Sequence, residues 1–146
     1  MKFRKTAKDL IYIAGLFDGE GSISLSYSLS GGSPYRRTKT FNLRISLSQK
    51  NTTVLYALKR VFGGFITNIQ WVTTSRNAEQ VLKLLLPYLR LKRRLALLAL
   101  EYRKTVGKYG INAARDRRRR DPIIPSRILK KNFRIKAEIE RLNVKD

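Results

Sequence analysis

Two carboxylates stand two residues apart near the N-terminus, each followed by a glycine, in the stretch Asp18-Gly19-Glu20-Gly21. They end a short, strongly apolar run over residues 10–17, and Ser22 then opens a segment in which polar and apolar residues alternate. The apolar run is typical of a buried helix and the alternation of a half-buried strand. A buried helix that brings an acid to its last turn, just before a strand, suits a metal-dependent active site.

The absence of two residue types narrows the possible chemistry. The chain has no cysteine and no histidine, which excludes disulfides, Cys/His zinc sites, Ser-His-Asp triads and histidine general bases. Hydrolysis would have to rest on Asp, Glu, Lys or Gln and on a hard cation held by oxygen ligands. Glu20 is the strongest candidate, because a carboxylate at a helix C-terminus is unfavourable against the helix dipole unless a cation compensates it.

The charge balance predicts a polyanionic partner. Lys and Arg number 32 against 10 Asp and Glu, for a net charge of +22 over 146 residues. Neutralisation of phosphates makes nucleic acid the favoured partner, while a ribosomal-type structural protein and a membrane-surface binder are the alternatives. The hydrophobic share of 42% is enough for one domain with a real core.

A long acid-free span predicts a DNA-binding surface. No acidic residue lies between Glu20 and Glu79, and the same span holds eight basic residues and two predicted hairpins. A two-stranded ribbon of this kind fits the major groove of DNA. We expect the outward side chains to contact double-stranded DNA, namely Ser24, Ser26, Ser28, Ser30, Arg36, Arg37, Lys39, Thr40, Asn42, Arg44, Ser46, Lys50, Gln70 and Arg76. The facing of residues 69–72 stays open, since both parities carry an apolar residue.

The order of the predicted elements indicates an α+β fold. A helix over residues 10–17 is followed by strands over 22–30 and 40–47, a helix from about 51 to 62 and a shorter hairpin over 65–74. Ser75 is predicted to cap a helix that ends at Pro87, and another helix is predicted from about 92 to 106. This order predicts an antiparallel sheet with helices on one face.

We expect the chain to divide into a core over residues 1–106 and a C-terminal part over residues 107–146. The C-terminal part begins with a basic segment, expected to be irregular up to residue 125, and ends with an amphipathic helix that can pack back on the core. The run Arg117-Arg118-Arg119-Arg120 suits a phosphate clamp, a solvated loop or a nuclear address, and the sequence does not separate them.

Small residues on the first helix predict self-association. Gly15 and Gly19 stand four residues apart, with Tyr12 and Leu16 on the same side. Such spacing lets two helix backbones approach closely, so we expect the glycine face to meet a second copy of the same helix.

The basic residues before Leu10 resemble a secretory leader, but the apolar run is short, ends in acids and lacks a cleavage site. We expect a soluble, intracellular protein that neither spans nor binds a membrane.

The nine residues Ile13–Gly21 resemble the motif of the LAGLIDADG homing endonucleases, with Ile13, Phe17 and Glu20 as substitutions. The resemblance implies an αββαββα fold with a saddle-shaped antiparallel sheet. It further implies a metal-dependent, site-specific DNA endonuclease, often intron-encoded, that cuts both strands of a long target. In that family Glu20 and the backbone carbonyl of Gly19 would hold Mg²⁺, and Mn²⁺ or Ca²⁺ can occupy the same site.

Two further segments resemble the family. Gln49 follows the second strand, where similar enzymes place a polar residue near the catalytic water, and Lys92 lies in a segment from which a lysine reaches the active site. A single motif implies a homodimer and hence a pseudo-palindromic target. The interface would include Tyr12, Gly15, Leu16, Asp18 and Gly19, with Asp18 in a structural role.

The alternative is a non-cleaving protein on the same scaffold. An RNA maturase or a DNA- or RNA-binding regulator would also be basic, so RNA remains a possible partner. Retention of Glu20 favours the nuclease, because pure binders of this family tend to lose the second acid.

Overall fold

The computed structural model describes residues 1–30, 38–109 and 126–144. In chain order the elements are α1 (Ala7–Glu20), β1 (Gly21–Ser30), β2 (Thr38–Ser48), α2 (Thr52–Phe62), β3 (Phe65–Thr67), β4 (Gln70–Thr74), α3 (Ser75–Leu85), α4 (Arg93–Tyr109) and α6 (Ser126–Val144). Predictions for Arg36, Arg37 and Arg117–Arg120 lie outside the described residues, as do the side chains of Ser28, Ser30, Lys39 and Thr40.

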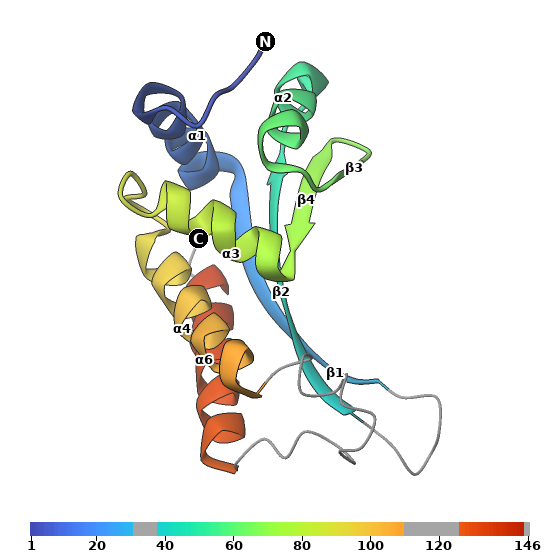
Figure 1. The fold of residues 1–146 in the computed structure, drawn as a ribbon, viewed down its shortest axis with the longest axis vertical. Coiled ribbons are helices and arrows are strands. Elements are labelled where there is room, and N and C mark those ends of the chain that lie inside the picture. The colour runs from blue at the N-terminus through green and yellow to red at the C-terminus, as the bar shows by residue number, and fades with distance from the viewer. Residues whose placement is uncertain (31–37, 110–125, 145–146) are drawn as a thin grey trace.

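The four strands form one antiparallel sheet in the order β1-β2-β4-β3. Helices α1, α3, α4 and α6 lie on one side of this curved sheet in Figure 1. The predicted α+β class, with an αββαββα core and C-terminal helices, is therefore confirmed. The alternation of apolar residues along β1 and β2 is what makes one face bind helices and leaves the other for solvent.

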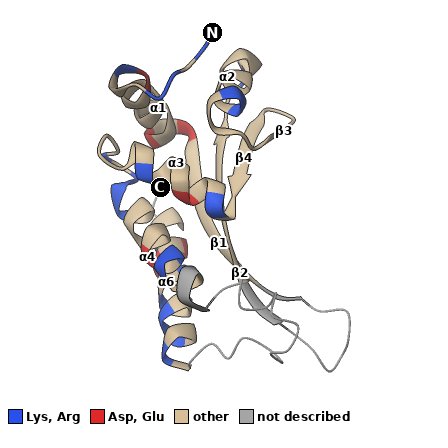
Figure 2. Cartoon of the chain, in the orientation of Figure 1, with Lys and Arg blue, Asp and Glu red and all other residues tan. Residues whose placement is uncertain are grey.

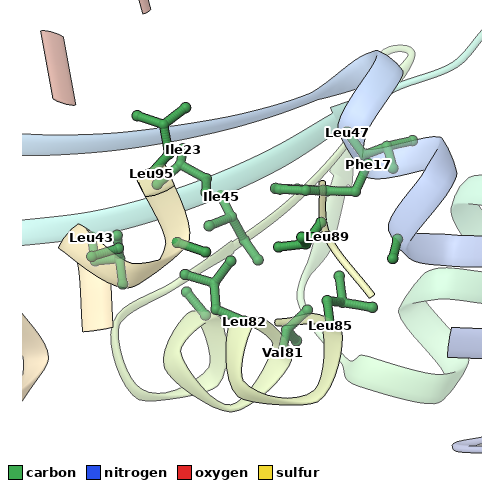
Figure 3. Close-up of a cluster of buried hydrophobic side chains, with 14 of the residues drawn as sticks. Phe17, Ile23, Leu43, Ile45, Leu47, Val81, Leu82, Leu85, Leu89 and Leu95 are labelled. Atoms are coloured by element: carbon green, nitrogen blue, oxygen red, sulfur yellow. The ribbon is translucent and has the colours of Figure 1, made fainter. Parts of the chain in front are cut away.

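The core lies between the sheet and the helices. Ile23, Ile45 and Leu47 project from the sheet and are at most 1% exposed. Figure 3 shows these side chains and Phe17 of α1 meeting leucines of the helix layer, among them Leu82. Burial of this cluster fixes which face of the sheet is covered, and so which face remains available to a partner.

Helix α6 packs against α4 and against β1, the edge strand of the sheet. Its Ile135 and Ile139 are buried, and its Phe133 ring lies 4.7 Å from the ring of Tyr27, centroid to centroid. Near the end of the helix, the Asn143 side-chain Nδ2 donates a hydrogen bond of 2.9 Å to the Ile23 carbonyl. The helix thereby packs against the edge strand of the sheet and bonds one of its backbone carbonyls.

Two element boundaries differ from the sequence prediction. Helix α4 continues to Tyr109, so residues 107–109 are helical rather than irregular. The cost of Gly107 inside a helix is only about 1 kcal/mol, which the helix tolerates. Helix α3 has Thr74 as its N-cap, with no side-chain capping bond; Ser75 is its first residue and has a positive φ of 54°. The Ser75 hydroxyl instead donates to Asn42 Oδ1 on β2.

None of the helices in the described ranges is long and apolar enough to cross a membrane.

Candidate active site and DNA-facing sheet

Helix α1 passes into β1 without a linker, and this junction positions Glu20. Gly21 caps the helix, and its N–H donates to the Phe17 carbonyl. A Cβ at Gly21 would lie 2.4 Å from the Phe17 ring and 2.5 Å from the Phe17 carbonyl oxygen, so only glycine fits. The sharp change from helix to strand leaves Glu20 exposed at the last position of the helix.

Asp18 joins the end of α1 to the turn between α3 and α4. Its Oδ2 accepts a hydrogen bond of 2.8 Å from the backbone N–H of Arg90, and its Oδ1 accepts one of 2.9 Å from the backbone N–H of Lys92. The carboxylate is thus directed into its own chain, and Asp18 is only 9% exposed. The predicted structural role of Asp18 has a defined geometry here, within one chain.

Lys92 completes this connection from the other side. Its ammonium Nζ donates a hydrogen bond of 2.8 Å to the backbone carbonyl of Asp18. A cation at this place is favourable, because the last carbonyls of a helix carry a partial negative charge. The fold therefore brings Lys92, Gly19 and Glu20 together at the C-terminus of α1, although Lys92 lies over 70 residues away in sequence.

The end of β2 lies beside the same junction. Gly21 pairs with Leu47, so Ser48 and Gln49 follow at the level of the last turn of α1. The Gln49 backbone N–H donates to the Ile69 carbonyl at 2.9 Å, and the Gln70 amide Nε2 donates to Ser48 Oγ at 3.2 Å. These bonds hold the half-buried Gln49 at the edge of the site by backbone pairing.

The donor set at the junction suits a hard divalent cation. Within the described residues, no group of three or more Asp, Glu, His or Cys side chains is close enough to hold a metal ion. Mg²⁺ does not require such a group, because it keeps several waters and binds one or two carboxylates together with substrate phosphates. An exposed carboxylate at Glu20, next to the backbone carbonyl of Gly19, fits that pattern.

The sheet face opposite the core is here called the open face. Its described side chains are Ser22, Ser24, Ser26, Asn42, Arg44, Ser46, Ser48, Phe65, Thr67, Gln70, Val72 and Thr74. Most are hydroxyls or amides, and Arg44 adds a guanidinium. The Asp and Glu residues marked in Figure 2 lie on helices, not on strands. The open face therefore presents hydrogen-bonding groups without carboxylates that would repel phosphate.

Several predicted DNA-binding residues are placed on accessible surface. Ser24, Ser26, Asn42 and Arg44 are exposed on the open face, and Lys50 and Arg76 are exposed beyond the strand ends. Ser46 differs, since it is only 7% exposed. It lies between Ser22 of β1 and Val72 of β4 in the middle of the sheet, so neighbours on both sides cover it.

The sequence did not show which side chains of residues 69–72 face the core, and the structure matches neither simple alternation. Trp71 and Val72 are both buried, on opposite faces of β4. Trp71 enters the core, where its indole Nε1 donates a 2.8 Å hydrogen bond to the Gly63 carbonyl. Val72 lies on the open face, Gln70 is half-buried there, and Ile69 is 50% exposed at the turn.

The sequence prediction missed several residues of the open face, and three of these are exposed. Ser22, Thr67 and Phe65 are exposed there, the last at 49%. The alternation of Phe65, Ile66 and Thr67 holds the signal, because Ile66 packs on the core side. Because β3 has only three residues, this alternation is too short to distinguish a strand from a loop by sequence.

An ion-pair cluster links the helices behind the site. Glu79 of α3 binds Arg103 of α4 at 2.9 Å and Lys83 at 3.0 Å. Partial burial alone would raise the pKa of the Glu79 carboxyl, but the hydrogen bonds and charges of Lys83 and Arg103 outweigh it and lower the pKa. The pair therefore holds α3 against α4, the two helices that flank the turn bearing Lys92.

Comparison with known proteins identifies the class. The family model described as LAGLIDADG endonuclease matches residues 13–104, well over half of the chain. The chain belongs to the LAGLIDADG endonuclease family. A search of curated proteins found no match.

Solved structures of homing endonucleases share the fold. I-CvuI, in complex with the I-CreI target and Mg, matches with a TM-score of 0.66 and 19% identity over 91% of this chain and 80% of that chain. I-TnaI matches with a TM-score of 0.66 and 17% identity over 99% of this chain and 96% of that chain. The archaeal intron-encoded I-Vdi141I, complexed with DNA, matches with a TM-score of 0.55 and 18% identity over 92% of this chain and 96% of that chain.

Proposed function

We propose that this protein is a site-specific homing endonuclease that cuts both strands of a long, pseudo-palindromic DNA target as a homodimer with a divalent metal. The observation that carries the proposal is the exposed Glu20 carboxylate at the junction of α1 and β1. Lys92 is fixed beside it by Asp18, and an acid-free sheet begins at the same point.

The exposed face of α1 supports a homodimer. Tyr12 is 52% exposed, and a Cβ at Gly15 or Gly19 would meet nothing within 4 Å. Two such faces can approach closely and remove Tyr12 and the half-buried Leu16 from water. A two-fold axis along this face would bring one Glu20 from each copy near the centre, and the target would share that symmetry.

The roles of the residues follow from their positions. Glu20 and the Gly19 carbonyl would hold Mg²⁺, with Mn²⁺ or Ca²⁺ able to take the same place. The cation, when bound, supplies activation of water and neutralisation of phosphate charge. The Lys92 ammonium can stabilise the negative charge that develops on the phosphate. The Gln49 amide can orient water, and the open face would hold the duplex.

The complexes in which relatives have been solved agree with this proposal. I-CvuI was solved with its target in the presence of Ca and with the I-CreI target in the presence of Mg. I-Vdi141I is intron-encoded and was solved with DNA. I-CpaMI was solved bound to uncleaved DNA, and the match with this chain covers only 43% of the I-CpaMI chain. That coverage suits a chain that needs a second copy of itself.

The test is incubation with a randomised duplex library and Mg²⁺, followed by sequencing of the cut ends. We expect selective, staggered ends that are symmetric about a centre. Glu20→Gln should abolish cleavage yet leave the Kd for the selected duplex within about twofold. Glu101→Gln, which changes a partly exposed acid on α4 paired with Lys131, is the matched control and should cut normally. Cleavage by Glu20→Gln at the wild-type rate would remove Glu20 from the site.

The second candidate is a non-cleaving RNA maturase or nucleic-acid-binding protein, and one surface favours it. Arg127, Lys130, Lys131 and Arg134 are exposed on α6 with i, i+3, i+4, i+7 spacing, which places them along one side of the helix. The buried Ile135 and Ile139 face inward, so this basic stripe lies apart from the open face. Binding of structured RNA without cleavage of any duplex in the library would select this function.

A further inference from the structure

One row of side chains crosses the whole open face and changes character along its length. The strand register aligns Ser22 of β1, Ser46 of β2, Val72 of β4 and Phe65 of β3. The row begins with hydroxyls and ends with two apolar side chains. Val72 is 0% exposed, whereas Phe65 on the outer strand is 49% exposed.

The neighbouring rows contain no such apolar step. On one side Thr67, Gln70 and Ser48 are aligned, and on the other Thr74 is aligned with Arg44 and Ser24. A half-exposed phenyl ring therefore ends one row, and the two adjacent rows carry only hydroxyl, amide and guanidinium groups. Ile66, the next residue, supplies the core contact of β3, and Phe65 lies beside the buried Val72 while about half of its own surface stays exposed.

The backbone before Phe65 is held tightly. Gly64 has a φ of 85°, and a Cβ there would lie 2.4 Å from the Val72 carbonyl oxygen. The preceding Gly63 carbonyl accepts the hydrogen bond from the Trp71 indole. Because the indole hydrogen bond and the pairing of Phe65 with Val72 hold the start of β3 against β4, the Phe65 ring is presented from a fixed point, and little freedom is lost when it docks.

We propose that Phe65, backed by Val72, is a specificity-determining residue that contacts the 5-methyl group of a thymine in each half of the DNA target. The proposal rests on the proposed function and adds a base preference to it. Thymine presents the one apolar group at the base edges of the major groove, and phenylalanine is among the side chains that contact it. The polar side chains on either side can form hydrogen bonds with base donors and acceptors but make no favourable apolar contact with a methyl group.

Uracil substitution gives a direct test, because deoxyuridine differs from thymidine only in that methyl. Each thymine of the selected duplex is replaced singly by deoxyuridine, and the Kd is measured with Ca²⁺ in place of Mg²⁺. At one thymine per half-site we expect the wild-type Kd to rise about fourfold, the loss for one buried methyl-sized group. Phe65→Ala should bind the thymine and deoxyuridine duplexes equally at that position, while Phe65→Leu should keep at least half of the discrimination on a logarithmic scale.

The matched control is Tyr56→Ala, which removes an aromatic ring of similar exposure, 53%, from α2, outside the sheet. It should leave every thymine preference unchanged. The proposal is overturned if no thymine of the target responds to loss of its methyl, or if Phe65→Ala retains the fourfold response. Either result can occur with symmetric cleavage intact, which leaves the proposed function standing. Absence of selective cleavage in the library would instead reject the function itself.

Discussion

Replacement of Asp18 by asparagine tests whether one carboxylate joins the end of α1 to the turn before α4. The carboxylate accepts two backbone hydrogen bonds, at 2.8 and 2.9 Å, and is almost fully covered. An asparagine keeps one acceptor but presents an NH₂ group to the other backbone N–H. One hydrogen bond is therefore replaced by a contact between two donors, and the remaining hydrogen bond is made to a neutral amide oxygen instead of a carboxylate.

The magnitude follows from the contribution of hydrogen bonds to charged groups, about 1.5–3 kcal/mol each. We expect Asp18→Asn to lower the free energy of unfolding by about 2–3 kcal/mol, since one such bond is lost and the other weakened. At roughly 3 °C of melting temperature per kcal/mol for a chain of this size, Tm should fall by about 6–9 °C. Asp18→Ala, which leaves both N–H groups without a partner, should cost more than Asp18→Asn.

The assay is urea and thermal unfolding followed by far-UV circular dichroism, without DNA and at one protein concentration, because the proposed dimerisation would make Tm depend on concentration. Glu140→Gln is the matched control. It makes the same chemical change in an exposed pair with Lys136 on α6, where the expected loss is only about 0.3–0.5 kcal/mol. If Asp18→Asn costs no more than this control, the connection between α1 and the turn is not a significant source of stability.

Three further outcomes are expected. Gly19→Ser should leave monomer folding intact, since a Cβ there meets nothing within 4 Å, but should weaken the helix pair; an unchanged dimer in sedimentation equilibrium would contradict the glycine contact. Gly64→Ala should lower the free energy of unfolding by more than about 2 kcal/mol, as expected for a strained and crowded backbone position. The φ of Gly64 is positive and a Cβ there would strike the Val72 carbonyl; a Tm within about 2 °C of wild type would refute this. Glu79→Gln should destabilise at neutral pH. Because the folded-state pKa of Glu79 is lowered, its contribution is present above its ordinary pKa of 4.5 and is lost as pH falls through the folded value. The difference in unfolding free energy between Glu79→Gln and wild type should therefore shrink in acid, and a difference independent of pH would rule out the ion pair as its cause.

The elements with strong local signals were predicted well. The alternation in β1 and β2 and the helix predicted from about residue 51 correspond to the observed elements, and Asn51 caps α2 by accepting the Thr53 N–H at its Oδ1 at 3.1 Å. The position of Glu20 at the end of α1 was also predictable, because the apolar run, the acid and the glycine are adjacent in sequence. These features depend on residues within one or two turns of each other.

Other features depend on neighbours that the sequence does not place. The burial of Ser46 requires strands on both sides of β2, and the simultaneous burial of Trp71 and Val72 requires the α2 end on one face and Phe65 beside it on the other. Alternation predicts which side chains share a face, but not how completely the adjacent strands cover them.

The sequence by itself determined the chemistry available to this protein: a cationic chain without histidine or cysteine, with one acid at a helix end and an acid-free span after it. The tertiary structure alone decided which distant groups join that acid. Lys92 reaches the end of α1 because the Asp18 carboxylate binds the backbone of a turn more than 70 residues away. Phe65 lies on the open face because its strand pairs with β4 in one register. Such contacts are set by closure of long loops and by packing, which local residue patterns do not encode.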